Sequence, residues 1–336
     1  MGLARYLGRK LVWTIIVFFV ALLLNFLLPR LIPGNPVDVI VGTLARGGGA
    51  SGEDLEKIHA HYMAEFGLDK PLWQQFFIYC NNVLHGNLGT SFSQYPASVN
   101  SLIGQALPWS LALMIPAVLI GWIVGNILGA VAAYRGGWVD RGGFVGSLFL
   151  SSIPPFALGI ILLFLIAVKM QILPIGGAYS FGLTPELTPA FFGDAITYWW
   201  LPFWSVVLVF FGGQAVGMRS MAIYELGSDY VNYNRGLGVR ESYTVSYIFR
   251  NAMLPQITGL ALAIAGIIAG SLITELVFSY PGLGSLLFAA IGSSDYPVIQ
   301  AITLLITIAV VLANFAVDVL TGFIDPRIRA SQTGER

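Results

Sequence analysis

Six long stretches of this chain carry almost no charged side chains, and they constrain its fold more than any other feature. A helix needs about 20 mostly apolar residues to cross the hydrocarbon core of a bilayer. Backbone groups find no water there, so each stretch must satisfy its own hydrogen bonds as a helix. The sequence therefore predicts an all-α polytopic membrane protein with six transmembrane helices: Leu11–Leu28, Trp109–Ala133, Phe144–Val168, Leu201–Met218, Gln256–Phe278 and Val298–Leu320.

The composition agrees with burial in lipid and excludes several other classes of protein. Of the 336 residues, 56% are hydrophobic and 10% are charged, whereas soluble domains carry about 25% charged residues. The formal net charge of zero argues against a nucleic-acid partner. The single cysteine, Cys80, excludes both an intramolecular disulfide and a thiolate metal cluster.

The distribution of positive charge predicts the orientation of the spans. The first apolar run is longer than the core of a usual signal peptide and is followed by Pro29 and Arg30 rather than a cleavage site, so we expect it to be retained. With the N-terminus inside, the cytoplasmic segments hold most of the 17 Lys and Arg residues, which places both termini in the cytoplasm. These cytoplasmic residues are Arg5, Arg9, Lys10, Arg135, Arg141, Arg219, Arg235, Arg240, Arg250, Arg327, Arg329 and Arg336.

We divide the chain into three regions. Residues 1–28 form the cytoplasmic N-terminus and the first span, residues 29–108 a large extracytoplasmic loop, and residues 109–336 a five-helix core with a cytoplasmic loop at 219–255. The extracytoplasmic loop is too long for a simple connection. Its pattern predicts two amphipathic helices, one from Ser51 to about Gly67 and one after Pro71. Packing on the outer face is their simpler role, and contact with an external partner is the alternative.

Enzyme chemistry has little support in the sequence. The three histidines, His59, His61 and His85, fall in the extracytoplasmic loop, without an HExxH motif. His59 and His61 lie two residues apart, so on a helix they point about 200° apart and cannot chelate one metal. The chain has no GxxxxGK[ST] phosphate-binding loop, so any ATP must be hydrolysed by another polypeptide. We expect no catalytic residue and no metal site here, and no intramembrane hydrolase.

Polar side chains inside the predicted spans are few. Lys169, Glu275 and Asp318 each lie close to a span end, where a structural or interfacial role is the simpler interpretation. A secondary transporter or channel that works without ATP would need a buried charge, and it is the alternative from a different class. Helix–helix hydrogen bonding explains buried amides most simply. Three of them are nevertheless candidates for lining a transport pathway: Asn25, Gln214 and Asn314.

The segment Arg219–Pro255 is polar, long and on the Arg-rich side. Ser228 or Asp229 would cap a first short helix, and Gly236 would end it. A second helix is predicted at Ser242–Met253, ending before the proline that follows. A short helix held crosswise beneath the bilayer would move the two attached spans, as a cytoplasmic driving partner requires.

Short motifs occur in a fixed order along almost the whole chain. They are Arg9-Lys10-Leu11, Leu31-Ile32-Pro33-Gly34-Asn35-Pro36, Phe66-Gly67-Leu68-Asp69-Lys70-Pro71, Gly86-Asn87-Leu88-Gly89-Thr90-Ser91-Phe92, Ser152-Ile153-Pro154-Pro155-Phe156, Leu173-Pro174, Glu275-Leu276-Val277-Phe278-Ser279-Tyr280-Pro281-Gly282-Leu283-Gly284, Asp295-Tyr296-Pro297-Val298 and Asp325-Pro326-Arg327-Ile328-Arg329. In this order they resemble the permease subunits of ATP-binding cassette (ABC) importers of the dipeptide/oligopeptide/nickel type.

In that family the cytoplasmic loop carries a Glu-Ala-Ala triplet followed after three residues by Gly. Gly238 fits this pattern, but the preceding triplet is Asn232-Tyr233-Asn234, so the Glu and both Ala are missing. The resemblance still implies that this loop docks an ATP-hydrolysing subunit. The residues that would carry the docking are Asp229, Tyr230, Asn232, Tyr233, Asn234, Arg235, Gly238, Arg250 and Asn251.

The resemblance also implies the rest of the machine, in a prokaryotic cell membrane. A second homologous permease would form a heterodimer with this chain, two ATP-binding subunits would hold ATP and Mg, and an extracytoplasmic solute-binding protein would deliver substrate. The chain itself would bind no cofactor and would not be an enzyme. Small peptides are the leading substrate. Oligosaccharides are the alternative, suggested only by Trp199, Trp200 and Trp204, and the spans lack the His or carboxylate clusters that nickel would need.

Overall fold

The computed structural model describes residues 2–31, 37–38, 41–42, 52–65, 67–265 and 272–324. Every named element in this part of the chain is a helix. Four helices are long and apolar enough to cross a bilayer: α1 (Gly2–Leu31), α5 (Val99–Arg135), α8 (Pro189–Leu226) and α14 (Tyr296–Ile324). They confirm a polytopic helical membrane protein. Each extends past its predicted span, because flanking polar residues continue the helix beyond the apolar run.

The third predicted span, Phe144–Val168, is not one straight helix. It is divided into α6 (Gly137–Ser152), α7 (Pro155–Leu162) and a π-helical turn, η1 (Leu163–Lys169), and the two halves are bent by 95°. Two consecutive prolines follow Ile153, whose backbone is extended with φ −94° and ψ 127°. The residue before a proline avoids the helical region, which explains the break and corrects the prediction of a continuous span.

The fifth predicted span begins within α10 (Glu241–Ala265), which continues through Pro255. The expected helix end before this proline is therefore wrong. Prolines are tolerated in membrane helices because neighbouring groups satisfy the freed carbonyl. Residues 266–271 of this span lie outside the described part, and α12 (Leu272–Val277) follows them. The count of six spans thus remains a prediction.

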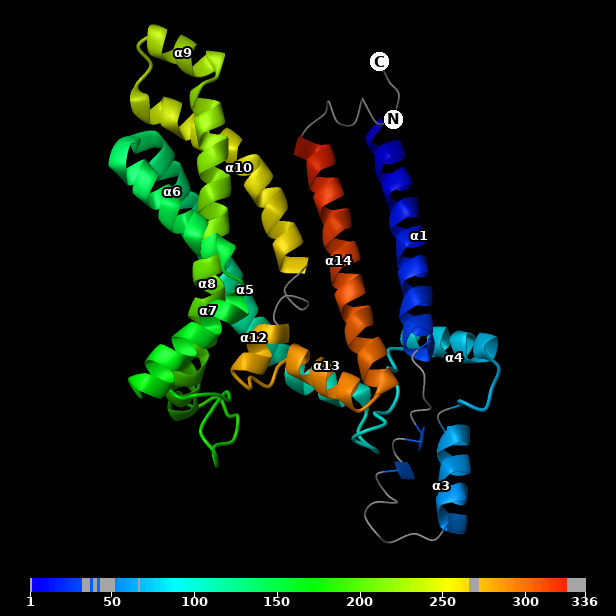
Figure 1. The fold of residues 1–336 in the computed structure, drawn as a ribbon. Helices are drawn as coiled ribbons and strands as arrows, with labels where there is room; N and C mark the ends of the chain where they lie inside the picture. The colour runs from blue at the N-terminus through cyan, green and yellow to red at the C-terminus, as the bar shows by residue number, and fades with distance from the viewer. Residues whose placement is uncertain are drawn as a thin grey trace.

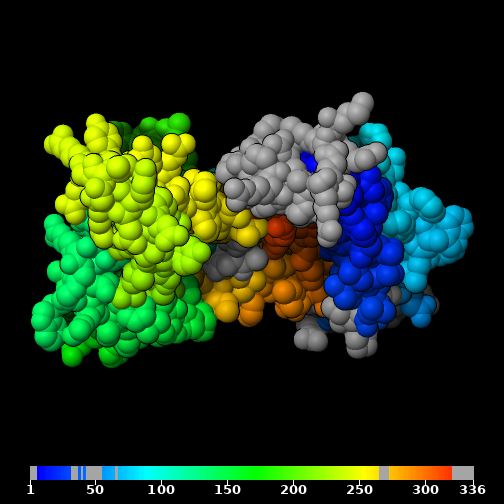
Figure 2. Space-filling view, turned by 90° about the horizontal axis from the view of Figure 1, so that it is seen from above, coloured from blue at the N-terminus to red at the C-terminus, as the bar shows by residue number. Residues whose placement is uncertain are grey.

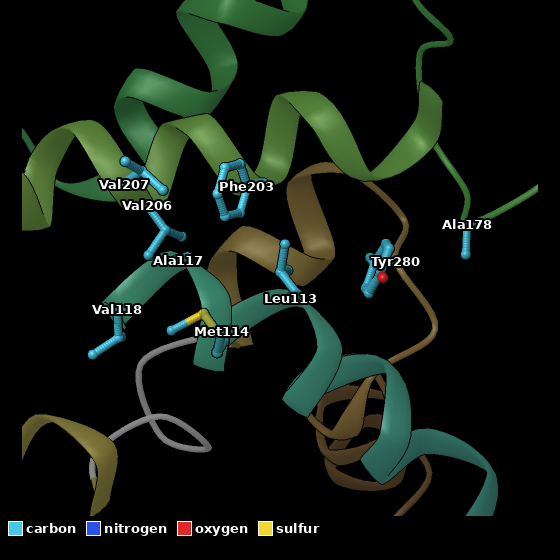
Figure 3. Close-up of a cluster of buried hydrophobic side chains, with 9 residues drawn as sticks. All are labelled: Leu113, Met114, Ala117, Val118, Ala178, Phe203, Val206, Val207 and Tyr280. Carbon is cyan, nitrogen blue, oxygen red and sulfur yellow. The ribbon is translucent and has the colours of Figure 1, made fainter. Parts of the chain in front are cut away.

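The centre of the fold is the contact between α5 and α8. Glycines on α5 face the α8 backbone so closely that a Cβ on Gly125 would lie 2.7 Å from the Cβ of Gln214, and one on Gly129 2.4 Å from the carbonyl oxygen of Ala215. Small residues at this spacing let membrane helices approach each other. Beside this contact, buried side chains from both helices and from the loop segments around Ala178 and Tyr280 form an apolar cluster (Figure 3).

The remaining helices are arranged at the two ends of this bundle. The start of α1, the end of α14 and the short helix α9 (Asp229–Gly236) lie at one end (Figure 1). At the opposite end lie α3 (Gly52–Glu65), α4 (Leu72–Leu84) and α13 (Leu283–Gly292). The two amphipathic helices predicted in the first loop are thus present as α3 and α4. The start of α1, the end of α14 and α9 thus share one end of the molecule, and its cytoplasmic location stays a prediction.

Candidate coupling site

The short helix α9 joins α8 to α10 at one end of the molecule (Figure 1). Ser228 precedes it with an extended backbone, as an N-cap residue does, but its hydroxyl donates to the Glu225 carbonyl at 2.6 Å rather than accepting from the helix. The helix ends where Gly238 adopts φ +68°. The amide of Gly238 donates to the Arg235 carbonyl at 3.1 Å. A left-handed residue after a helix end is commonly glycine, which explains Gly238 by backbone conformation alone.

Contacts on one side of α9 connect it to both neighbouring helices. Val231 is fully buried. The Tyr230 hydroxyl donates to the Glu225 carboxylate of α8 at 2.7 Å, and the Asn251 amide of α10 lies 3.3 Å from both groups. Burial and the hydrogen bond to Glu225 raise the pKa of Tyr230, so its hydroxyl stays protonated and can donate. The short helix is therefore tied to α8 and α10 together.

Large side chains are exposed on α9, just after it, on the last turn of α8 and at the start of α10. The Tyr233 side chain is 67% exposed and that of Leu237 62%, and Tyr224, Tyr243 and Tyr247 are also exposed. Viewed from this end, the lime and yellow residues of α8–α10 form an open surface (Figure 2). Exposed aromatic groups of this kind are enriched at protein interfaces. We call this set, Tyr224, Tyr233, Leu237, Tyr243 and Tyr247, the α9 surface.

A charged clamp lies near the α9 surface. The Arg219 guanidinium of α8 binds the Asp140 carboxylate of α6 through two hydrogen bonds of 2.5 and 2.6 Å, and it lies over the Phe144 ring at 4.4 Å. Both side chains of this pair are partly buried. Paired bonds of this geometry fix orientation as well as distance. The clamp holds the start of α6 against the last turns of α8, close to where α9 attaches.

The end of α5 also reaches the start of α10. The Tyr134 hydroxyl donates to the Glu241 carboxylate. Tyr134, Arg235, Glu241 and Thr244 line a cavity of about 150 Å³ between these elements. Motion of α9 would therefore reach α8 and α10 directly, and α5 through the Tyr134–Glu241 bond to α10.

At the opposite end, a buried carboxylate explains the glycines of the Glu275–Gly284 motif. Glu275 is fully buried and accepts from the Gly284 amide at 2.7 Å and the Ser110 hydroxyl at 2.7 Å. A Cβ on Gly282 would lie 2.4 Å from this carboxylate. The carboxylate also lies at the start of α13, where the helix dipole favours negative charge. Glu275 is thus structural, as its position near a span end suggested.

A second buried carboxylate holds the loop before α5. Asp295 accepts from the Ser91 hydroxyl at 2.5 Å, the Phe92 amide at 3.0 Å and the Ser93 amide at 2.9 Å. These bonds join two of the motifs that suggested a family, Gly86–Phe92 and Asp295–Val298. The motifs far apart in the chain are therefore parts of one structure at this end.

Comparison with known proteins identifies the family. Residues 125–330 match the family described as binding-protein-dependent transport system inner membrane component. The chain belongs to this family. It is 34% identical, over 96% of its length and 98% of the relative's, to the di/tripeptide transport system permease protein DppB of Pseudomonas aeruginosa. It is 31% identical to the dipeptide transport system permease protein DppB of Lactococcus lactis and 36% identical to the glutathione transport system permease protein GsiC of Salmonella choleraesuis. In each of these two comparisons 97% of the chain is covered, with 100% of the first relative and 99% of the second.

The chain is accordingly a multi-pass inner-membrane permease subunit of an ABC importer that depends on a binding protein. Among the residues predicted to couple it to an ATPase, Tyr230 and Asn251 meet at Glu225. Asp229, Asn232, Tyr233, Arg235, Gly238 and Arg250 are exposed, and Asn234 is half-buried. The structure thus gathers the predicted residues around one short helix, and their docking role remains a prediction.

The three predicted pathway residues of the permease lie in separate places. Asn25 is buried and bonds to the Gln300 carbonyl at 2.8 Å, which joins α1 to α14. Gln214 lines a largely apolar cavity of about 360 Å³ beside α5, and its buried amide oxygen lacks a hydrogen-bond partner in the described part. Asn314 lines a cavity between α1 and α14, beside the Lys10–Asp318 ion pair of 2.7 Å. Their role in a pathway stays untested.

The tryptophans that suggested sugar stacking have packing partners within the permease. Trp199 stacks on Phe203 with ring centroids 3.9 Å apart and donates to the Ala112 carbonyl at 3.1 Å. Trp200 and Trp204 pack edge to face at 5.8 Å. These contacts account for the three rings, and the relatives do not favour an oligosaccharide substrate.

Sequence reasoning missed several residues that organise the permease. Glu225 anchors α9, but nothing in the local pattern separates it from a solvated carboxylate. Asp140 and Arg219 are separated by 79 positions, and Ser91 and Asp295 by 204. The pairing of such residues leaves no periodic signal in one sequence.

Proposed function

We propose that this permease moves small peptides across the inner membrane. The observation that carries this proposal is similarity along nearly the full chain to proteins named for di- and tripeptide, dipeptide and glutathione transport. Glutathione is itself a tripeptide derivative, so the named substrates share one chemical class. Reconstituted with its partners, the permease is expected to accumulate a labelled dipeptide when ATP is supplied.

We further propose the composition of the complex. A second, homologous permease pairs with this chain as a heterodimer, two ATP-binding subunits dock beneath them with ATP and Mg, and a solute-binding protein docks at the α3 and α4 end. The chain contributes the transport pathway and the coupling helix α9, and it hydrolyses no ATP itself. Support comes from the binding-protein-dependent family and from the lack of a phosphate-binding loop in the sequence.

Coupling would run through α9. ATP binding would draw the ATP-binding subunits together and push the α9 surface, and the bonds of Tyr230 and Asn251 to Glu225 would carry this motion into α8 and α10. A partner can shift the conformation only through contacts that differ between states. A hinged helix tied to two spans is the kind of element on which such contacts can act.

Uptake in membrane vesicles tests the substrate class. A labelled dipeptide should enter in an ATP-dependent manner, and unlabelled di- and tripeptides should compete. Competition by an oligosaccharide but not by peptides would overturn the peptide proposal while leaving the family assignment intact. Uptake without ATP would favour a secondary transporter.

A further inference from the structure

A polar cavity of about 300 Å³ lies at the end of the molecule opposite α9. It is open on one side and lined by the last turn of α1, by the end of α3 and the turn that follows it, by α4, by the Asn87–Thr90 loop and by the start of α14. Its polar lining includes Arg30, Lys70, Gln75, Tyr79, Asn82 and Asn87. Among the described residues that line it, none is an Asp or Glu. The cavity is therefore a basic and amide-rich site.

Among the described residues, the principal cation of this cavity, Arg30, has only neutral partners. The Arg30 guanidinium donates to the Gln75 side-chain oxygen at 3.1 Å and to the Phe26 carbonyl at 2.9 Å, and it lies over the Phe26 ring at 3.7 Å. No described carboxylate pairs with it. A partly buried charge without a counter-ion is costly. An anion in the cavity would supply the missing partner.

Further donors face the same space. The Tyr79 hydroxyl accepts from Asn25 at 3.3 Å, and its own proton has no acceptor among the described residues. Burial raises the pKa of Tyr79 to about 12, so that proton is retained at neutral pH. Arg30, Lys70 and Tyr79 together offer the charged and hydroxyl donors that a phosphate oxygen accepts.

The surroundings of the cavity are apolar. Helix α4 has no fully buried residue, lies across the end of α1 (Figure 1), and leaves Trp73 62% exposed and Phe77 65% exposed. Next to it, α1 exposes Leu24 and Leu28. A helix with an exposed aromatic face beside a polar one lies in the interface of a bilayer, at the depth of the lipid headgroups.

We propose that this cavity binds the phosphate of an anionic phospholipid, whose acyl chains lie against the exposed faces of α4 and α1. The polar lining supplies positive charge to pair with the negatively charged phosphate. The exposed apolar faces of α4 and α1 begin where the acyl chains of the lipid would lie. The proposal is independent of the transported substrate. Such a lipid would fix α4 on α1 where Phe76 and Tyr79 already pack against Phe26.

Native mass spectrometry of the full-length chain with its co-purifying subunits tests this site. After delipidation, phosphatidylglycerol is added to the original protein and to Arg30→Gln, Lys70→Gln and Lys57→Gln variants. Lys57 is exposed on α3 and does not line the cavity, so it serves as the matched control. We expect about tenfold weaker binding of one lipid by the Arg30 and Lys70 variants and no change in the control. Equal binding by all four proteins would overturn the proposal.

Two competition arms distinguish the source of the anion. Inorganic phosphate at millimolar concentration, or a dipeptide, should leave the lipid bound; displacement by either would assign the cavity to a free anion or to a peptide carboxylate instead. If Arg30→Gln fails to fold, the lipid site is tested instead by the melting temperature of the Lys70→Gln variant with each lipid. Its stabilisation by phosphatidylglycerol over phosphatidylcholine should be smaller than that of the original protein, and an equal shift would contradict the site.

Discussion

The Tyr230 hydroxyl of α9 donates a 2.7 Å hydrogen bond to the Glu225 carboxylate at the end of α8. The Asn251 amide of α10 reaches the same carboxylate at 3.3 Å. One acidic side chain thus joins the short helix to the two longer ones. If ATP-binding subunits displace α9, these hydrogen bonds transmit the displacement to the transmembrane helices.

Removing the Tyr230 hydroxyl should weaken this link without unfolding the protein. A Tyr230→Phe substitution keeps the ring and removes the bond to Glu225, which contributes about 2 kcal/mol, more than a neutral hydrogen bond, because the acceptor is charged. We expect slower peptide uptake per ATP hydrolysed and a slightly lower melting temperature, measured in proteoliposomes and by thermal unfolding. Tyr179→Phe is the control, since Tyr179 lies outside the α9 surface and packs on Trp109. Equal effects of the two substitutions would argue against the Glu225 link.

The effect of a substitution at Gly238 should depend on how readily the new residue adopts a positive φ, and not on the size of its side chain. Its φ is +68°, and nothing lies within 4 Å of a Cβ placed there. A Gly238→Val substitution should strain the turn by about 1–2 kcal/mol and uncouple transport from ATP hydrolysis, whereas Gly238→Asn should retain most coupling because Asn adopts this region more readily. Membrane insertion should be normal in both. Normal uptake by the Val variant would count against a coupling role for this turn.

The turn before α13 should reject even one methyl group. A Cβ on Gly282 would lie 2.4 Å from the fully buried Glu275 carboxylate. Gly282→Ala should therefore lower the free energy of unfolding by about 1–3 kcal/mol, as overpacking does. Gly292→Ala is the control, since a Cβ at Gly292 meets open space. Thermal unfolding in detergent compares them, and equal melting temperatures would contradict the described position of Glu275.

The clamp between α6 and α8 should respond to loss of charge. The Arg219 guanidinium holds the Asp140 carboxylate through two bonds. Asp140→Asn should cost about 2 kcal/mol of stability, because a charge-assisted bidentate pair becomes a weaker bond. Asp140→Arg or Arg219→Asp alone should destabilise the protein, and the double variant that exchanges the two residues should recover part of the stability lost in these single variants. If the double variant is no more stable than the sum of the single substitutions predicts, the pair does not act as a clamp.

The sequence alone predicted those helices that are determined by nearby residues in the chain. Runs of apolar residues predicted helices at α1, α5, α8 and α14, because lipid leaves the backbone no other partner. The extent of these helices was underestimated, since polar flanks such as Val99–Pro108 continue α5 beyond the apolar run. The signals for α3 and α4 were caps and prolines, and these also act locally.

The remaining features depend on contacts between distant parts of the chain. The 95° bend after Ser152 had a local signal in Pro154-Pro155, but the apolar composition on both sides outweighed it. Helix α10 continues through Pro255, although the proline suggested a helix end. The Glu225 link and the Asp140–Arg219 clamp arise only when α8 is placed against its neighbours. A single sequence does not contain that placement.

Site-specific crosslinking tests most directly whether the α9 surface docks an ATP-binding subunit. A photoreactive phenylalanine analogue replaces Tyr233 in the α9 surface or, as a control, the 84% exposed Leu84 of α4 at the opposite end. The complex is irradiated in native membranes, and the adducts are sequenced by mass spectrometry. The account predicts an adduct from position 233 to a protein with a phosphate-binding loop, and none to that protein from position 84. No adduct to such a protein from position 233, in membranes that import peptide, would contradict it.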